Sequence, residues 1–225
     1  MGKYQTSART RLALIDAAGQ LAAEKGFNAI STRAIAQLAG ENIGSIHYHF
    51  GGKEKLFEAV IHSVANLWEE HPLDEVLASC DMATVYGQAE AIRRILHREV
   101  SLLFDEQMPS WYCRVIYQVM QYPNQLQDNF SAIVIDPANE QICKVFKTID
   151  PTMDDETAEF HFLLLLTPLF SHADYRTFIL KKLGKTEYSS QYLQRLVDTC
   201  AMQTLLFFNL PTSGNEHPHD SKSIS

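Results

Sequence analysis

The spacing of apolar residues near the start of the chain predicts a helix over residues 9–26. Leu14, Ala17, Ala18 and Leu21 follow the i, i+3, i+4, i+7 spacing that places side chains on one face of an α-helix. Gly26 stands where a helix commonly ends in the left-handed conformation. We expect Phe27 to pack into the core just beyond that end.

Two short helices joined by a tight turn are predicted next, within residues 31–55. Ser31 is a suitable N-cap for a helix that closes at Gly40, and Asn42 can cap another over residues 43–49. Gly51 and Gly52 then interrupt the chain, and a long helix begins at Lys53 and reaches about Glu70. Such a pair of helices has the form of a helix-turn-helix DNA-binding motif.

The rest of the chain also predicts helices, because no stretch alternates apolar and polar residues long enough for a convincing strand. Asp136-Pro137, Asp150-Pro151 and Asp154 supply cap and first-turn residues. We expect an all-α fold, with a DNA-binding domain at 8–55, a helical body at 56–210 and a polar, disordered tail at 211–225. The expected helices of the body are 85–105, 110–122, 125–134, 137–149, 154–182 and 187–209.

Charge is unevenly distributed along the 225 residues. The net charge is −8, but residues 1–55 carry seven Lys or Arg and four Asp or Glu, a local +3, which leaves −11 for the remainder. A basic end on an acidic body fits a protein that contacts phosphates with that end only. No apolar run reaches the roughly 20 residues of a membrane span, and no secretory signal is present, so a cytoplasmic location is expected.

Catalytic, cofactor and metal chemistry find no support in the sequence. The four cysteines, Cys80, Cys113, Cys143 and Cys200, form no C-x-x-C pair, so neither a zinc site nor a redox motif is indicated. No Ser-His-Asp arrangement, glycine-rich phosphate loop or H-E-x-x-H is found. We therefore expect no enzyme activity, no cofactor and no metal.

The segments LIDAAGQLAAEKGF, STRAIAQLAG and GSIHYHFGGKEKLF, within residues 14–57, resemble the DNA-binding domain of the TetR family of bacterial transcription regulators. The resemblance implies an all-helical ligand-binding and dimerisation domain after it. It also implies a dimer that binds a palindromic double-stranded DNA operator, usually as a repressor, and that is released by a small-molecule effector. The sequence does not identify that effector.

The resemblance also implies which residues contact DNA. Thr32 and Arg33 would contact phosphate at the start of the first motif helix, where backbone amides also favour anions, and Arg33 could reach a base edge. Ile43, Gly44 and Ser45 would face the bases. The remaining candidates, which would bind backbone phosphates, are His47, Tyr48, His49 and Lys53.

Two positions depart from the common family pattern. Position 47, often Tyr or Asn, is His here, and the turn reads Gly40-Glu41-Asn42 in place of Gly-Val-Ser or Gly-Val-Asn. Because Glu41 places a negative charge near the DNA, we expect it either to point away or to tune specificity.

The two C-terminal long helices are expected to form a homodimer. Residues 160–170 are apolar on nearly every side, and residues 187–209 hold more apolar side chains than one core face requires, so a partner is indicated. We expect Pro168 to kink the first of these helices, since it lacks a backbone N–H.

Candidate effector residues are polar or aromatic side chains on apolar faces. Glu99 points inward with its helix's apolar side and needs a partner, which is either a neighbouring Arg or a ligand amine or hydroxyl. Trp68, Trp111, Cys113, Tyr117 and Met120 line a pocket or form ordinary core. The alternative to a DNA-binding regulator is an all-α ligand-binding or scaffold protein that no longer reads DNA.

Overall fold

The computed structural model describes residues 2–105, 108–121 and 123–212, and across these ranges it contains helices and no strand. The predicted all-α fold is therefore confirmed. The helices are α1 (Gly2–Lys25), α2 (Thr32–Ala39), α3 (Ile43–Phe50), α4 (Lys53–Glu69), α5 (Leu73–Leu77), α6 (Val85–Leu103), α7 (Tyr112–Met120), α8 (Gln125–Phe130), α9 (Asp136–Ile149), α10 (Asp155–Asp174), α11 (Arg176–Leu183) and α12 (Ser190–Phe207).

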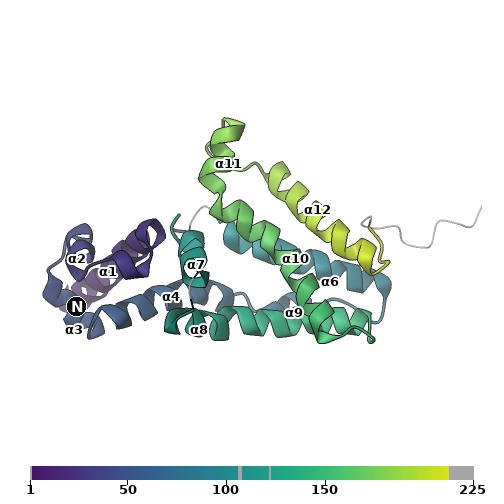
Figure 1. The fold of residues 1–225 in the computed structure, drawn as a ribbon, viewed down its shortest axis with the longest axis horizontal. Helices are drawn as coiled ribbons and strands as arrows, with labels where there is room; N and C mark the ends of the chain where they lie inside the picture. Colours follow the sequence, from purple (N-terminus) through teal and green to yellow (C-terminus); the bar gives the residue numbers. More distant parts are fainter. Residues whose placement is uncertain (1, 106–107, 122, 213–225) are drawn as a thin grey trace, which may run out of the picture.

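Helices α1, α2 and α3 form a small unit at one end of an elongated molecule, packed on the first half of α4 (Figure 1). Its centre consists of Leu14, Ile35, Ile46 and Leu56, all fully buried. Phe27 follows α1 in a 3₁₀ turn and packs edge-to-face on Phe57, with ring centroids 4.8 Å apart. These apolar contacts hold the two motif helices in a fixed orientation.

The predicted helix ends in this unit are confirmed where local capping sets them. The Ser31 hydroxyl accepts a hydrogen bond from the Ala34 N–H at 3.1 Å, and Gly40 closes α2 in the left-handed conformation. Gly26 ends α1 differently from the prediction, because its φ of 75° is combined with an extended ψ of 153°. Helix α1 also begins earlier than expected, at Gly2 rather than residue 9.

The body is built around α6, which packs against α12, α10, α5 and α9. Helix α4 enters from the small unit and reaches α8 at its far half, so one unbroken helix passes through the expected domain boundary at residue 55 (Figure 1). Helix α7 lies between α1 and α10 and contacts both. Helix α5 was not predicted.

The single helix expected over residues 154–182 is wrong, because the chain breaks at Tyr175 into α10 and α11. Asp154 caps α10 as predicted, accepting from the Thr157 N–H at 2.8 Å, and the helix continues through Pro168 to Asp174. At the break, the Tyr188 hydroxyl donates to the His172 carbonyl at 2.9 Å. A side chain from a distant loop thus satisfies a carbonyl near the helix end, where intrahelical partners run out.

The two helices expected over 125–134 and 137–149 are instead one continuous segment. A π-helical turn, Ser131–Ile135, joins α8 to α9, and the Asp136 N–H donates to the Ser131 carbonyl five residues earlier. Because Pro137 has no N–H, the wider turn lets the helix pass the proline without a break. The disordered tail predicted for 211–225 lies, from residue 213 on, outside the described residues.

Candidate nucleic-acid interface

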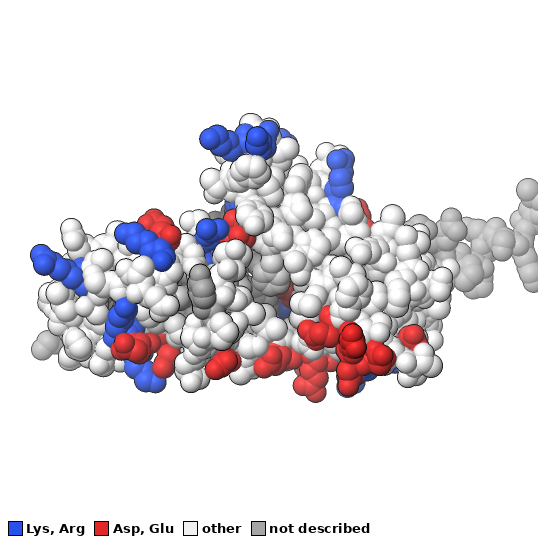
Figure 2. Space-filling view, in the orientation of Figure 1, with Lys and Arg blue, Asp and Glu red and all other residues white. Residues whose placement is uncertain are grey.

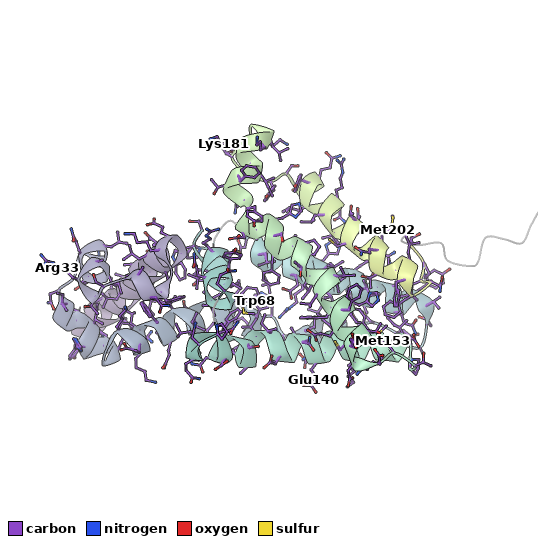
Figure 3. All side chains as sticks on the ribbon, in the orientation of Figure 1. Arg33, Trp68, Glu140, Met153, Lys181 and Met202 are labelled. Carbon is purple, nitrogen blue, oxygen red and sulfur yellow. The ribbon has the colours of Figure 1, made fainter. Side chains whose placement is uncertain are left out.

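The predicted DNA-contacting residues lie together on the outer end of the small unit, away from the body, and Arg33 marks that end in Figure 3. Ile43 is 44% exposed and Tyr48 82% exposed, although both are large side chains that a monomeric core would normally cover. Arg33, Gly44 and His47 are exposed, whereas Thr32, Ser45, His49 and Lys53 are half-buried. This surface is therefore accessible to a partner molecule as large as duplex DNA.

The first turn of α3 is fixed by its cap. The Asn42 side-chain oxygen accepts from the Ser45 N–H at 3.0 Å. A Cβ added at Gly44 would lie 3.0 Å from that same oxygen, which is tighter than an ordinary contact. Glycine at position 44 thus keeps the cap undisturbed.

Glu41 is engaged by α1 rather than left free near the DNA-facing side. The Thr10 hydroxyl donates to a Glu41 carboxylate oxygen at 2.8 Å, and the Arg11 guanidinium lies 5.2 Å from the centre of the Phe50 ring. These contacts join α1 to the turn before α3 and to the end of α3. Glu41 therefore has a structural partner, which the sequence did not reveal.

Lys53 occupies the first position of α4, with its ammonium 5.2 Å from the centre of the Phe57 ring. A cation at a helix N-terminus is opposed by the helix dipole, whereas an anion there is stabilised by it. A phosphate placed beside Lys53 would meet both the ammonium and the free amides of the first turn of α4.

A buried polar cluster anchors the far end of α4 to α6. Arg98 pairs with Glu99, and its guanidinium also donates to the Trp68 carbonyl at 3.1 Å and the His71 carbonyl at 2.7 Å. The Trp68 indole N–H donates to the other Glu99 oxygen at 3.0 Å. Burial raises the pKa of the Glu99 carboxyl, while Arg98 and Trp68 oppose that rise. Of the two partners predicted for Glu99, the structure shows the arginine.

A second anchor joins α1 to α7. The Trp111 indole N–H donates to the Asp16 carboxylate at 2.7 Å, and the indole ring lies directly on Gly19, where a Cβ would come within 2.5 Å of three ring atoms. Trp111 is buried. The small unit is thus held to the body at two separate places, through α4 and through α1.

The six predicted effector residues do not lie together. Trp68, Trp111 and Cys113 line a groove of about 1520 Å³ between α1, α7, the end of α10 and α11. Glu99 is buried in its ion pair and is not part of the groove wall. Tyr117 and Met120 are 38% and 40% exposed and also lie outside it. The structure thus brings three of the six residues together in one groove, whereas positions 117 and 120 of α7 face outward.

Asp174, which sequence reasoning missed, lines the same groove with its side chain 7% exposed. One carboxylate oxygen accepts from Arg114 at 2.8 Å. The sequence feature that could have identified Asp174 is its position as an acidic residue in the last turn of a helix, which the helix dipole disfavours.

In the described part of the chain, no three His, Cys, Asp or Glu side chains are grouped to hold a metal ion, and no helix is long and apolar enough to cross a membrane.

An exposed recognition-type helix after a capped turn, joined by a long helix to an all-helical body, is the architecture of one-component DNA-binding regulators. Comparison with known sequences agrees with this class. Residues 14–60 match the family of bacterial regulatory proteins of the tetR type. No curated protein matches the chain.

Solved structures share the fold over most of the chain. A protein from Mesorhizobium loti described as a TetR-family transcriptional regulator is 20% identical, with 89% of this chain and 97% of that one covered at a TM-score of 0.56. A Clostridium perfringens protein described as a fatty acid metabolism regulator is 19% identical (86% and 96% covered, TM-score 0.62). A Rhodococcus transcriptional regulator is also 19% identical (88% and 96%, 0.54). Residues 14–60 thus match the N-terminal domain of the tetR family, and the chain as a whole has the same fold as these solved regulators.

Proposed function

We propose that this protein is a homodimeric repressor whose two N-terminal domains bind a palindromic operator, and which a small molecule bound in the C-terminal domain releases from DNA. The observation that carries the proposal is the solvent-accessible surface of α2, α3 and the first residue of α4, defined here by Thr32, Arg33, Ile43–Ser45, His47–His49 and Lys53. In this reading the residues at 43–45 contact bases, and the others contact phosphates.

The distribution of charge supports this assignment. Figure 2 shows lysine and arginine side chains over the small unit, beside a few acidic ones, and again at the tip of α11, whereas acidic side chains gather along the lower edge of the body. Binding that depends on phosphates is local and electrostatic, so an acidic body remote from the DNA does not prevent it. The acidic lower edge of the body would itself repel DNA phosphates.

A gel-shift titration on the promoter of the protein's own gene, repeated at several salt concentrations, tests the proposal. Several phosphate contacts per subunit predict a steep fall in affinity as salt rises. No shift, or an affinity that does not change with salt, would favour the alternative of an all-α ligand-binding or scaffold protein that no longer reads DNA.

Lys53→Ala and Ser45→Ala should affect DNA binding in different ways. Lys53→Ala removes a proposed phosphate contact, so it should weaken binding about equally on all sequences. It should also reduce, by about one, the slope of the logarithm of the binding constant against the logarithm of the salt concentration. Ser45→Ala removes a group that faces the bases and should change which operator variant is preferred. Competition binding against a set of single-base operator variants measures both effects. An unchanged preference in Ser45→Ala would show that the assumed orientation of α3 in the groove is wrong.

The dimer is proposed to form through α10 and α12, because both helices leave large apolar side chains exposed. On α12 these are Met202, Leu206 and Phe207, at 48%, 62% and 47% exposure, and on α10 they are Phe160 and Leu163, at 57% and 52%. Figure 3 shows Met202 on the outer side of α12. A contiguous apolar surface of this kind marks a protein interface.

Leu206→Glu should convert the dimer to a monomer, because it places a charge in the centre of the proposed interface. Size-exclusion chromatography with light scattering measures the mass directly. Val85→Glu is the matched control, since Val85 is 49% exposed at the start of α6, outside α10 and α12. If both variants stayed dimeric, the interface would lie elsewhere.

A further inference from the structure

The groove between the small unit and the body has aromatic walls. Trp68 and Trp111, the two tryptophans of the chain, both line it, as do Tyr112, Tyr175 and Phe178. Tyr175 and Phe178 are 53% and 61% exposed, so much of the aromatic surface on the α11 side is open to solvent. Such a wall suits a ligand with an apolar or aromatic portion.

Asp174 gives the groove an acidic group whose charge is only partly compensated. Its Oδ1 accepts from Arg114 Nη1 at 2.8 Å, and the Arg114 side chain is 44% exposed. Its Oδ2 is buried and has no hydrogen-bond partner among the described residues. Asp174 is also the last residue of α10, where the helix carbonyls add negative potential. A buried oxygen without a donor is costly, and a ligand with N–H groups would remove that cost.

We propose that this groove binds an organic cation, an ammonium or amidinium attached to an apolar body, with Asp174 as the group that accepts its N–H and the aromatic walls as its apolar contact. The aromatic faces also attract a cation directly. This inference rests on the proposed function in one respect, since the organic cation is taken to be the effector that releases the protein from DNA.

Among the described residues, four basic side chains line the groove, namely Arg114, the half-buried Arg176, Lys181 and Lys185, together with five acidic ones. Lys181 and Lys185 are exposed, and Lys181 lies on the projecting α11 (Figure 3), where water screens its charge. Arg114 already has the Asp174 carboxylate as a partner. Asp174, by contrast, is more than nine-tenths buried, so its charge acts in a lower dielectric and is screened less.

A ligand in this groove would contact both anchors between the small unit and the body. Trp111 donates to Asp16 of α1, and Trp68 donates to Glu99 within the α4–α6 cluster. A ligand changes the relative placement of two domains only if it binds one arrangement better than the other. Contact with both indoles provides a direct route to that difference. Moving the Trp111 ring changes a hydrogen bond between the body and the small unit, and moving the Trp68 ring changes the hydrogen bond that holds the end of α4 to α6.

Intrinsic tryptophan fluorescence provides the binding test, because both tryptophans line the groove. The full-length protein is titrated with 4-phenylbutylamine, 4-phenylbutanol and 4-phenylbutanoate, which share one apolar body and differ in charge. The amine should bind tightest. Asp174→Asn should lower the affinity for the amine about tenfold or more and leave the affinity for the alcohol unchanged, as expected for loss of a charged hydrogen bond.

Arg114→Gln should act in the opposite direction and raise the affinity for the amine, because it removes the cation that competes for Asp174. Asp155→Asn, an exposed carboxylate on α10 with a side chain 96% exposed, is the matched control and should change nothing. Equal affinity for the three probes, tighter binding of the butanoate, or an unaltered amine affinity in both Asp174→Asn and Arg114→Gln would overturn the site.

Operator binding is then measured separately, by fluorescence anisotropy with and without the amine. Amine binding that depends on Asp174, in a protein that binds no DNA, would refute the proposed function and leave the cation site standing. DNA binding that is insensitive to a bound amine would refute only the regulatory role of the groove.

Discussion

Glu99→Ala is expected to lower the free energy of unfolding by about 3–5 kcal/mol, because it leaves the buried Arg98 guanidinium without its carboxylate. Arg98 is 8% exposed and Glu99 1%, so water cannot replace the lost partner without opening the structure. The Trp68 indole N–H would lose its acceptor as well. Urea unfolding followed by circular dichroism measures the change, and an unaltered m-value would show that stability, rather than compactness, has changed.

Glu90→Ala provides the matched control on the same helix. Glu90 pairs with Arg94 across one turn of α6, but both side chains remain 40% or more exposed. Glu90→Ala should therefore lower the free energy of unfolding by no more than about 0.5 kcal/mol. Equal losses in Glu99→Ala and Glu90→Ala would mean that water reaches the Arg98 cluster, and the anchor between α4 and α6 would then be weak.

Features that depend on local chemistry could be predicted from the sequence. Ser31, Asn42 and Asp154 each cap a helix as expected, because an N-cap hydrogen bond joins residues only two or three positions apart. The inward direction of Glu99 also follows from helical periodicity alone, since position along a helix sets the face. For the same reason the residues proposed to contact DNA, which share one short motif, could be named together.

Features that depend on distant partners could not be predicted. The break after α10 involves Tyr188, and the hydrogen bond of Trp111 joins residues 95 positions apart. Trp111 and Tyr117 belong to the same helical segment, yet one is buried on α1 and the other faces solvent. Which side of α7 is covered depends on where α1 lies, and no periodicity within α7 contains that information.

Gly19→Ala is expected to destabilise the protein by about 1–3 kcal/mol, the usual cost of overpacking a buried contact. In the interior of a helix this substitution normally stabilises by about 0.5–1 kcal/mol, because alanine restricts the unfolded chain. Here the new methyl would lie 2.5 Å from three atoms of the Trp111 ring. The rigid indole can make room only by moving away from α1, which also strains its hydrogen bond to Asp16.

A second background separates this contact from any intrinsic effect of position 19. In Trp111→Ala protein the indole is absent, so Gly19→Ala should return to the ordinary helix behaviour and become stabilising. The change of sign between the two backgrounds measures the coupling directly, as a double-mutant cycle of unfolding free energies. The same effect in both backgrounds would show that α1 and α7 are not held by this contact. Gly19 lies on α1, and Trp111 is the residue directly before α7. A confirmed sign change would therefore establish that the small unit and the body share one cooperative connection, through which a ligand in the adjacent groove could act on the helices proposed to contact DNA.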